Sequence, residues 1–151
     1  MISINDKAYQ ILQTLNHNGF ESYIVGGAVR DFIRNKKPHD WDIATNATPE
    51  EIQNLFQNTF DKGIKFGTVG VNINSEQFEV TTFRKEGRYN DSRHPDEVSW
   101  AKTIEEDLSR RDLRMNAIAL DKDLNLVDPF GGVNDIYFRK SKRARRKNME
   151  R

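Results

Sequence analysis

Apolar positions near the start of the chain follow a helical period and then a strand-like run. They recur every three or four residues, at Ile4, Ala8, Ile11, Leu12 and Leu15. This period predicts an amphipathic helix over residues 4–18, and Gly19 is a suitable end for it. The next apolar run, Tyr23–Val25, predicts a short buried strand. The dipeptide Gly26-Gly27 ends this strand, and a helix of about two turns is expected over Ala28–Arg34.

The middle of the chain alternates polar and apolar residues, as strands do. Residues 40–45 alternate and predict a second strand. Thr48, Pro49 and Glu51 then have the spacing of a capping box with proline at the first helical position, which predicts a helix start. Alternation returns in two runs, Val69-Val71-Ile73 and Phe78-Val80-Thr82. These runs predict two paired strands joined by a turn at residues 74–76.

The last third of the chain mixes a long polar stretch with short ordered elements. Residues 84–101 are polar and irregular, and loops of this length tend to be functional or mobile. Thr103 and Glu106 predict a further capped helix, and residues 117–127 predict a hairpin. The sequence therefore predicts an α+β fold: a small mixed β-sheet with helices packed on one face. We expect one domain over residues 1–136 and a separate tail over residues 137–151.

Charge separates the same two regions. The 151 residues carry a net charge of +1, yet residues 139–151 hold eight basic residues and one acid, a net +7, and residues 1–138 carry −6. A basic stretch of this density indicates an acidic partner, nucleic acid above all, and its own repulsion predicts disorder in isolation.

Composition also excludes several classes of protein. Cysteine is absent, which rules out disulfides, thiolate zinc sites and thiol nucleophiles. No apolar run approaches the roughly 18 residues of a membrane span, and the N-terminus does not have the order of a signal peptide. A cytoplasmic location without a membrane partner is expected.

Two short motifs are candidates for chemistry. Gly26-Gly27 lies between a strand and a helix, where free N–H groups can meet a phosphate, and Arg30 adds a fork-shaped donor one turn later. Taken alone, a Gly-Gly pair favours an ordinary turn, because short glycine motifs have many chance matches. Asp40 and Asp42 are two residues apart in a predicted strand, so both carboxylates point to one face.

Two converging carboxylates repel each other unless a cation lies between them, and oxygen ligands beside a polyphosphate favour Mg²⁺. Two solvated acids at a strand end are an equally good interpretation of Asp40 and Asp42 alone. Glu79 alternates with apolar residues and faces away from the core. It would complete a three-acid cluster if its strand neighbours the one that carries Asp42, and otherwise it is an exposed strand residue.

Four motifs in order resemble one family. The segments are YIVGGAVRDFIRNKKPHDWDIATNATPEEI (residues 23–52), FEVTTFRKEGRYNDSRHPDEV (78–98), EEDLSRRDLRMNAIALD (105–121) and DPFGG (128–132). They resemble the polymerase β-like head domain of class II tRNA nucleotidyltransferases, which are the bacterial CCA-adding enzymes and their poly(A) polymerase relatives.

The resemblance implies metal-dependent transfer of nucleotides from CTP and ATP to an RNA 3′ end, most of all CCA addition to tRNA. It implies Asp40 and Asp42 as ligands of Mg²⁺ and Glu79 as a third catalytic acid that supports the attacking hydroxyl. It further implies a set of nucleotide-binding residues: Gly26, Gly27, Arg30, Arg111, Asp112 and Asn116. Residues 84–101 would be the loop that positions the primer or nucleotide.

The resemblance ends near residue 136, where family members continue into a neck that reads the incoming base. We therefore expect a truncated chain, one piece of a split enzyme with a partner chain that supplies the missing parts, or a head that works alone. Poly(A) addition, a non-catalytic nucleotide- or RNA-binding module, and an inactive fragment remain alternatives. Base choice cannot be derived from the head.

Overall fold

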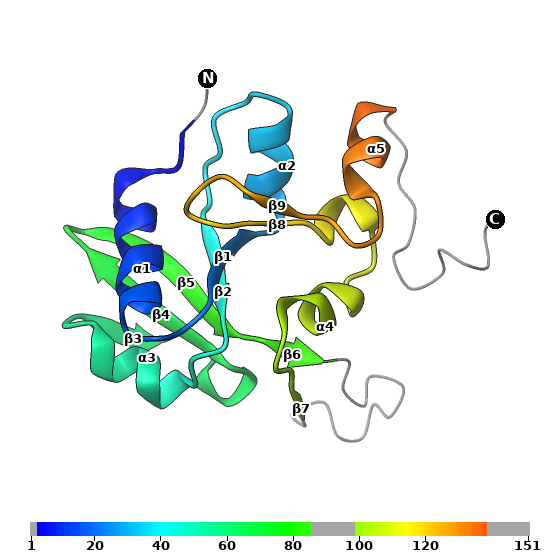
Figure 1. The fold of residues 1–151 in the computed structure, drawn as a ribbon. Coiled ribbons are helices and arrows are strands. Elements are labelled where there is room, and N and C mark those ends of the chain that lie inside the picture. Colours follow the sequence, from blue (N-terminus) through cyan, green and yellow to red (C-terminus); the bar gives the residue numbers. More distant parts are fainter. Residues whose placement is uncertain (1–2, 86–98, 139–151) are drawn as a thin grey trace.

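The computed structural model describes residues 3–85 and 99–138, which form a twisted sheet with helices on both sides (Figure 1). The strands are β1 (Ser22–Val25), β2 (Asp42–Thr45), β3 (Thr59–Asp61), β4 (Thr68–Ile73), β5 (Glu76–Thr82), β6 (Arg84–Lys85), β7 (Ser99–Trp100), β8 (Ala119–Leu120) and β9 (Leu126–Val127). The α-helices are α1 (Asp6–His17), α2 (Gly27–Ile33), α3 (Pro49–Leu55), α4 (Ile104–Ser109) and α5 (Gly132–Tyr137). Two 3₁₀ turns, η1 (Ile64–Phe66) and η2 (Arg114–Asn116), complete the described elements.

The main sheet has seven strands in the order β3-β4-β5-β2-β1-β8-β9. Only the central pair, β2 and β5, is parallel, and all its other pairs are antiparallel, so the mixed sheet is confirmed. Strands β4 and β5 are joined by the two-residue turn Asn74-Ser75, whose φ angles of 48° and 72° suit the right-handed twist of a hairpin. The β6–β7 pair is a separate ribbon.

Side-chain caps begin α1, α3 and α4, and the caps at Thr48 and Thr103 are the predicted ones. The side chain of Asn5 accepts hydrogen bonds from the N–H groups of Lys7 (2.8 Å) and Ala8 (3.1 Å) at the start of α1. Thr48 and Glu51 form both bonds of a capping box at α3. These contacts satisfy N–H groups that have no partner within the helix, which is why the helix starts near residues 48 and 103 were predictable from their capping residues. The cap at Asn5 was not predicted, because the first helix was recognised by its apolar period alone.

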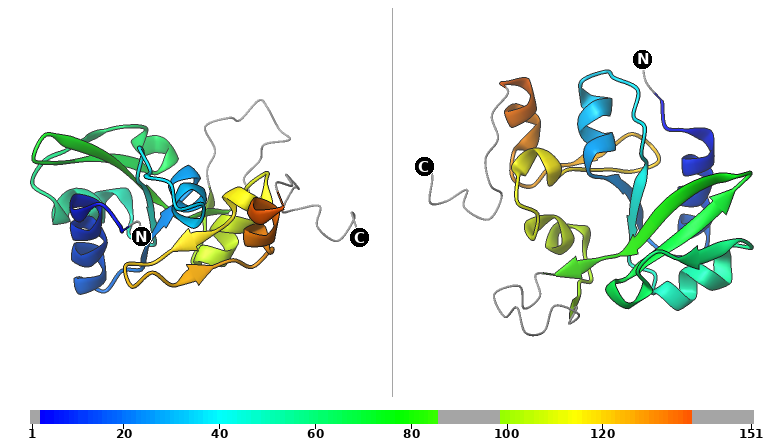
Figure 2. Two further views of the ribbon diagram at one scale, coloured as in Figure 1. Left: turned by 90° about the horizontal axis from the view of Figure 1, so that it is seen from above. Right: turned by 180° about the vertical axis from the view of Figure 1, so that it is seen from behind.

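The larger core lies on one face of the sheet. Helices α1 and α3 contact each other on this face, and α2 also packs there (Figure 2). The buried residues from this side include Ile11 and Leu15 of α1, Ile43 of β2 and Val80 of β5. Among the described residues, no helix is long and apolar enough to cross a membrane.

A second core on the opposite face corrects the prediction that helices pack on one face only. Val25, Ala44 and Ala119 point away from the first core, and Ile104 and Leu108 of α4 cover them. Consecutive residues of β1, β2 and β8 thus enter opposite cores, because neighbouring strand residues point to opposite faces. The α+β class is confirmed, and α4 gives the fold a helix on each side.

Other predictions differ at the ends of elements. Strand β2 begins at Asp42 rather than at residue 40, since its pairing with β1 stops where Val25 meets Asp42. The ends of the predicted loop form β6 and β7, and residues 86–98 lie outside the described residues. Neither β3 nor α5 was predicted, and α5 crosses the proposed boundary at residue 136. The expected disorder of the tail from residue 139 onwards also falls outside the described part.

Candidate active site

The Gly26-Gly27 motif and the carboxylate of Asp42 lie next to each other at one end of β1 and β2. Val25 pairs with Asp42, and Gly26 follows Val25 directly. Gly26 has φ 76° and ψ −148°, a conformation that is open to glycine and strained for residues with a side chain. A Cβ atom at Gly26 would lie 3.9 Å from Oδ2 of Asp42. The chain therefore turns into α2 immediately beside the Asp42 carboxylate.

Helix α2 presents an arginine next to its own first turn. A Cβ atom at Gly27 would lie 3.5 Å from Nη2 of Arg30, so this guanidinium folds back over the start of the helix. Nη1 of Arg30 donates to Oδ1 of Asn116 at 3.4 Å, and its buried Nε has no hydrogen-bond partner among the described residues. The structure thus brings together three parts of the predicted nucleotide site: the glycines, Arg30 and Asn116.

The acids come together through the parallel strand pair. Ile43 pairs with Val80, so the preceding residues, Asp42 and Glu79, lie next to each other on β2 and β5 and face away from the larger core. The two strands are therefore neighbours, which is the condition on which a three-acid cluster depended. Asp40, Asp42 and Glu79 line one pocket of about 280 Å³.

The charges of these acids act on one another. Partial burial, together with the charges of Glu79 and Asp40, raises the pKa of Asp42 above its ordinary value, and the charge of Arg111 opposes this rise. Repulsion of this kind is typical of carboxylates that share a site, and a bound cation relieves it. Glu79 also lies 3.9 Å from Nζ of Lys62, in an ion pair that is half exposed on both sides.

The donor set suits a hard cation that also takes ligands from a substrate. The acids offer oxygen atoms only, as Mg²⁺ prefers. Among the described residues, no group of three His, Cys, Asp or Glu side chains is placed to hold one ion. Mg²⁺ keeps several waters and is usually held by one or two carboxylates plus substrate phosphates, so Asp40 and Asp42 fit this ion as a pair.

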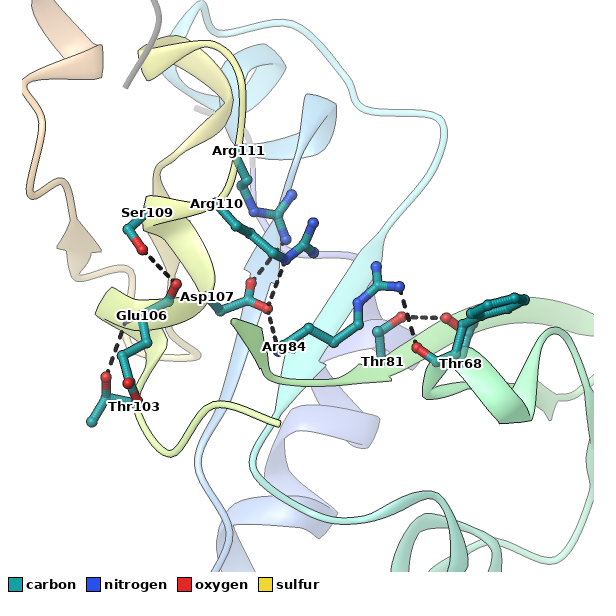
Figure 3. A network of polar contacts seen from close by, with 10 residues as sticks. Thr68, Thr81, Arg84, Thr103, Glu106, Asp107, Ser109, Arg110 and Arg111 are labelled. Carbon is teal, nitrogen blue, oxygen red and sulfur yellow. Dashed lines mark hydrogen bonds and ion pairs between the residues drawn. The ribbon is translucent and has the colours of Figure 1, made fainter. Parts of the chain in front are cut away.

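Arg110 and Arg111, at the end of α4, lie beside Asp107 on the face of the sheet that carries α4 (Figure 3). Nη2 of Arg111 donates to Oδ2 of Asp107 at 3.1 Å, and Nε of Arg110 lies 3.5 Å from Oδ1 of the same carboxylate. Burial lowers the pKa of Arg111, whereas the charges of Asp107 and, to a smaller extent, Asp42 raise it. Arg111 therefore lies within electrostatic reach of both the anchoring Asp107 and the acid cluster.

Two charged residues that contact the predicted site residues, Asp107 and Lys62, were not predicted. Asp112 is exposed on the turn after α4. Asp107 was not singled out, although its spacing of three and four residues from Arg110 and Arg111 is a signal for helical ion pairs. Lys62 is close to Glu79 only because of the tertiary fold, so no local signal could have found it.

The segment after the site is held against it by an ion pair between the mostly buried Arg114 and the buried Asp135. Arg114 of η2 donates from Nε and Nη2 to the two carboxylate oxygens of Asp135 in α5, at 2.9 Å and 2.7 Å. A Cβ atom at Gly132 would lie only 2.0 Å from the carbonyl oxygen of Arg114, so α5 approaches η2 as closely as only glycine permits. Helix α5 is thus held against η2, which also carries Asn116.

Comparison with known proteins places these features in context. The family model of the poly A polymerase head domain matches residues 22–142. A CCA-adding enzyme from Listeria monocytogenes is 54% identical over 130 residues, which cover 86% of this chain and 33% of that protein. The chain spans about a third of the length of this curated relative.

Two solved structures extend the comparison. The crystal structure of the Bacillus stearothermophilus CCA-adding enzyme in complex with CTP has a TM-score of 0.81 and 39% identity, over 95% of this chain and 35% of that one. The structure of a CCA-adding enzyme with ATP has a TM-score of 0.69 and 25% identity, over 92% of this chain and 33% of that one.

Proposed function

The chain belongs to the family of the poly A polymerase head domain, and we propose from this premise that it is the catalytic head of an RNA nucleotidyltransferase. Its reaction is the addition of CCA to the 3′ end of tRNA, with CTP and ATP as substrates. The names of its relatives favour CCA addition over poly(A) addition. A tRNA substrate would place the reaction in the cytoplasm.

One observation carries the proposal: a glycine turn, an acid pair and two separate arginines converge on one end of β1 and β2. The N–H groups at Gly26-Gly27, together with Arg30, would hold the triphosphate, because a helix start with a nearby guanidinium attracts phosphate. Arg111, with Asp112 and Asn116 nearby, would hold the phosphate or ribose of the same nucleotide.

The acids would bring the two reacting groups together. Asp40 and Asp42 would hold Mg²⁺, which lowers the pKa of the attacking 3′-hydroxyl and offsets charge on the phosphates when it is bound. Glu79, beside Asp42 in the sheet, would accept the proton of this hydroxyl. The hydroxyl oxygen then forms a bond to the α-phosphorus, and pyrophosphate leaves on the side of the arginines.

The direct test is incorporation of labelled CTP or ATP. The full chain is incubated with Mg²⁺ and a tRNA that lacks its CCA end, with intact tRNA as the control. Extension of only the shortened tRNA supports the proposal. No incorporation at high protein concentration would refute the activity of this chain and leave the fold unaffected.

A second arm distinguishes catalysis from simple binding. The double replacement of Asp40 and Asp42 by Asn should abolish incorporation, because both proposed metal ligands are lost. Binding of tRNA by this variant should persist if phosphate contacts elsewhere dominate affinity. A non-catalytic RNA-binding module would instead show no difference between this variant and the unchanged protein in either assay.

A further inference from the structure

Asp107 of α4 is a buried carboxylate among arginines, and it touches none of the proposed metal ligands in any described contact. Only 1% of the residue is exposed. It accepts hydrogen bonds from Nη2 of Arg111 at 3.1 Å and from the backbone N–H of Arg84 at 2.9 Å, and it pairs with Arg110 at 3.5 Å (Figure 3). One side chain thus joins the end of α4 to the strand that follows β5.

A buried charge is costly unless it is paired and hydrogen-bonded, so the position of Asp107 needs an explanation. Its neighbour Leu108 is fully buried in the second core, and this packing fixes the helix turn that carries Asp107. Arg111 follows the helix and is tied to it through its backbone N–H, which donates to the carbonyl of Leu108 at 3.1 Å. The Asp107 carboxylate is therefore a fixed hydrogen-bond acceptor for the Arg111 guanidinium.

Arg111 keeps donors available after it has bonded to Asp107. A guanidinium has five N–H donors, and the hydrogen bond to Asp107 uses Nη2. Its buried Nε has no hydrogen-bond partner among the described residues. Leu108, whose carbonyl accepts from the N–H of Arg111, shares the second core with Val25, and Val25 directly precedes Gly26. Arg111 therefore lies on the face of the sheet that Asp42 and Glu79 also face.

We propose that Asp107 is a positioning residue, whose carboxylate holds the Arg111 guanidinium in the orientation that meets the triphosphate of a nucleotide bound at Gly26-Gly27. This inference rests on the proposed function, because it assumes a nucleotide at that turn. Holding a long side chain in its bound conformation before the ligand arrives removes an entropic cost of binding. The gain in affinity from one such side chain is about three- to tenfold.

The test measures phosphate affinity on folded protein. Calorimetric titration with magnesium tripolyphosphate, which has no base or ribose, reports on the triphosphate site alone, and CTP is titrated in parallel. Asp107→Asn keeps the shape of the side chain and removes its charge. We expect it to bind tripolyphosphate and CTP about three- to tenfold more weakly at a temperature where melting curves show it folded.

Glu106→Gln is the matched control. It removes one carboxylate from the same helix, one residue away, and its amide oxygen can still accept the hydrogen bond from the N–H of Lys102 that Glu106 accepts at 2.9 Å. This variant should bind both ligands as tightly as the unchanged protein. Asp107→Asn protein that is folded and binds with unchanged affinity would refute the inference and leave Asp107 as a structural residue.

A second variant pair covers the case in which Asp107→Asn alone does not fold. Arg111→Gln removes the charge that Asp107 anchors, and the double variant Asp107→Asn with Arg111→Gln leaves no unpaired member of that pair. If Asp107 acts through Arg111, Arg111→Gln should bind tripolyphosphate and CTP more weakly than the unchanged protein. Adding Asp107→Asn to this variant should then change the affinity less than twofold. A further tenfold loss in the double variant would overturn the inference.

These outcomes separate the two proposals. If the unchanged protein binds tripolyphosphate but transfers no nucleotide to tRNA, the proposed function fails and the role of Asp107 is still decided by the variants. If the unchanged protein binds neither CTP nor tripolyphosphate, no triphosphate site exists and both proposals are refuted.

Discussion

The two adjacent glycines at the start of α2 should respond to the same substitution in opposite ways. Gly27 is the first helical residue and has no left-handed backbone, and a Cβ atom there meets Nη2 of Arg30 at an ordinary 3.5 Å. Gly27→Ala should therefore fold normally. Alanine is favoured over glycine in a helix by up to about 1 kcal/mol, which corresponds to a melting temperature that is unchanged or about 2–4 °C higher.

Nucleotide binding by Gly27→Ala should nevertheless weaken. The added methyl group occupies space in front of the helix N-terminus, where phosphate oxygens would approach the N–H groups. Loss of one hydrogen bond to a charged group costs about 1.5–3 kcal/mol, or roughly a tenfold to hundredfold loss of affinity for CTP. Calorimetric titration with CTP and Mg²⁺ measures this directly.

Gly26→Ala is the comparison that tests the backbone conformation of the turn. Its φ of 76° with ψ of −148° is strained for alanine, at a cost of about 1–3 kcal/mol, so its melting temperature should fall by roughly 2–12 °C. Gly27→Ala protein with parental CTP affinity would refute the close approach of phosphate to this helix. Equal destabilisation by the two substitutions would refute the conformational distinction between them.

Three further outcomes follow from charge and ligand binding. Burial, with the charges of Glu79 and Asp40, raises the pKa of Asp42, so its contribution to stability is present below about pH 4 and is lost as pH rises through the raised value. Asp42→Asn should therefore melt higher than the unchanged protein at pH 7 in metal-free buffer, with a smaller difference at pH 4; an equal difference at both values would contradict this cause. Asp135→Ala removes the bidentate partner of the mostly buried Arg114 side chain and should cost about 3–5 kcal/mol, a fall of roughly 6–20 °C by scanning calorimetry. Mg²⁺ with CTP at a hundred times its Kd should stabilise the unchanged protein by about 2.7 kcal/mol, EDTA should reverse most of this shift, and no shift at saturation would contradict the proposed site.

Local signals explain why much of the fold was predictable. The helix starts at Thr48 and Thr103 depend on contacts within four residues. In the structure the N–H groups of Glu51 and Glu106 donate to the hydroxyl oxygens of Thr48 and Thr103, as predicted. The β4–β5 hairpin depends on a two-residue turn and on alternation that any single strand displays. Strand β3, by contrast, has three residues, and so short a run has no detectable period.

The packing of segments that are distant in the sequence could not be predicted from local signals. The face on which α4 packs depends on where Ile104 and Leu108 find an uncovered apolar surface, and that surface exists only after β1, β2 and β8 have paired. The burial of Asp107 depends on the same event. Its spacing from Arg110 and Arg111 could indicate a helical ion pair, but a solvated helix face has that spacing too.

Residue type and local spacing were enough to identify the order of the motifs, the candidate acids Asp40, Asp42 and Glu79, and the glycine turn. That Asp42 and Glu79 are neighbours follows from the fold alone, through the parallel register of Ile43 with Val80. Strand register is a contact between segments more than thirty residues apart, and no local period encodes it. The chemistry was therefore visible in the sequence, whereas its convergence on one site was a property of the folded sheet.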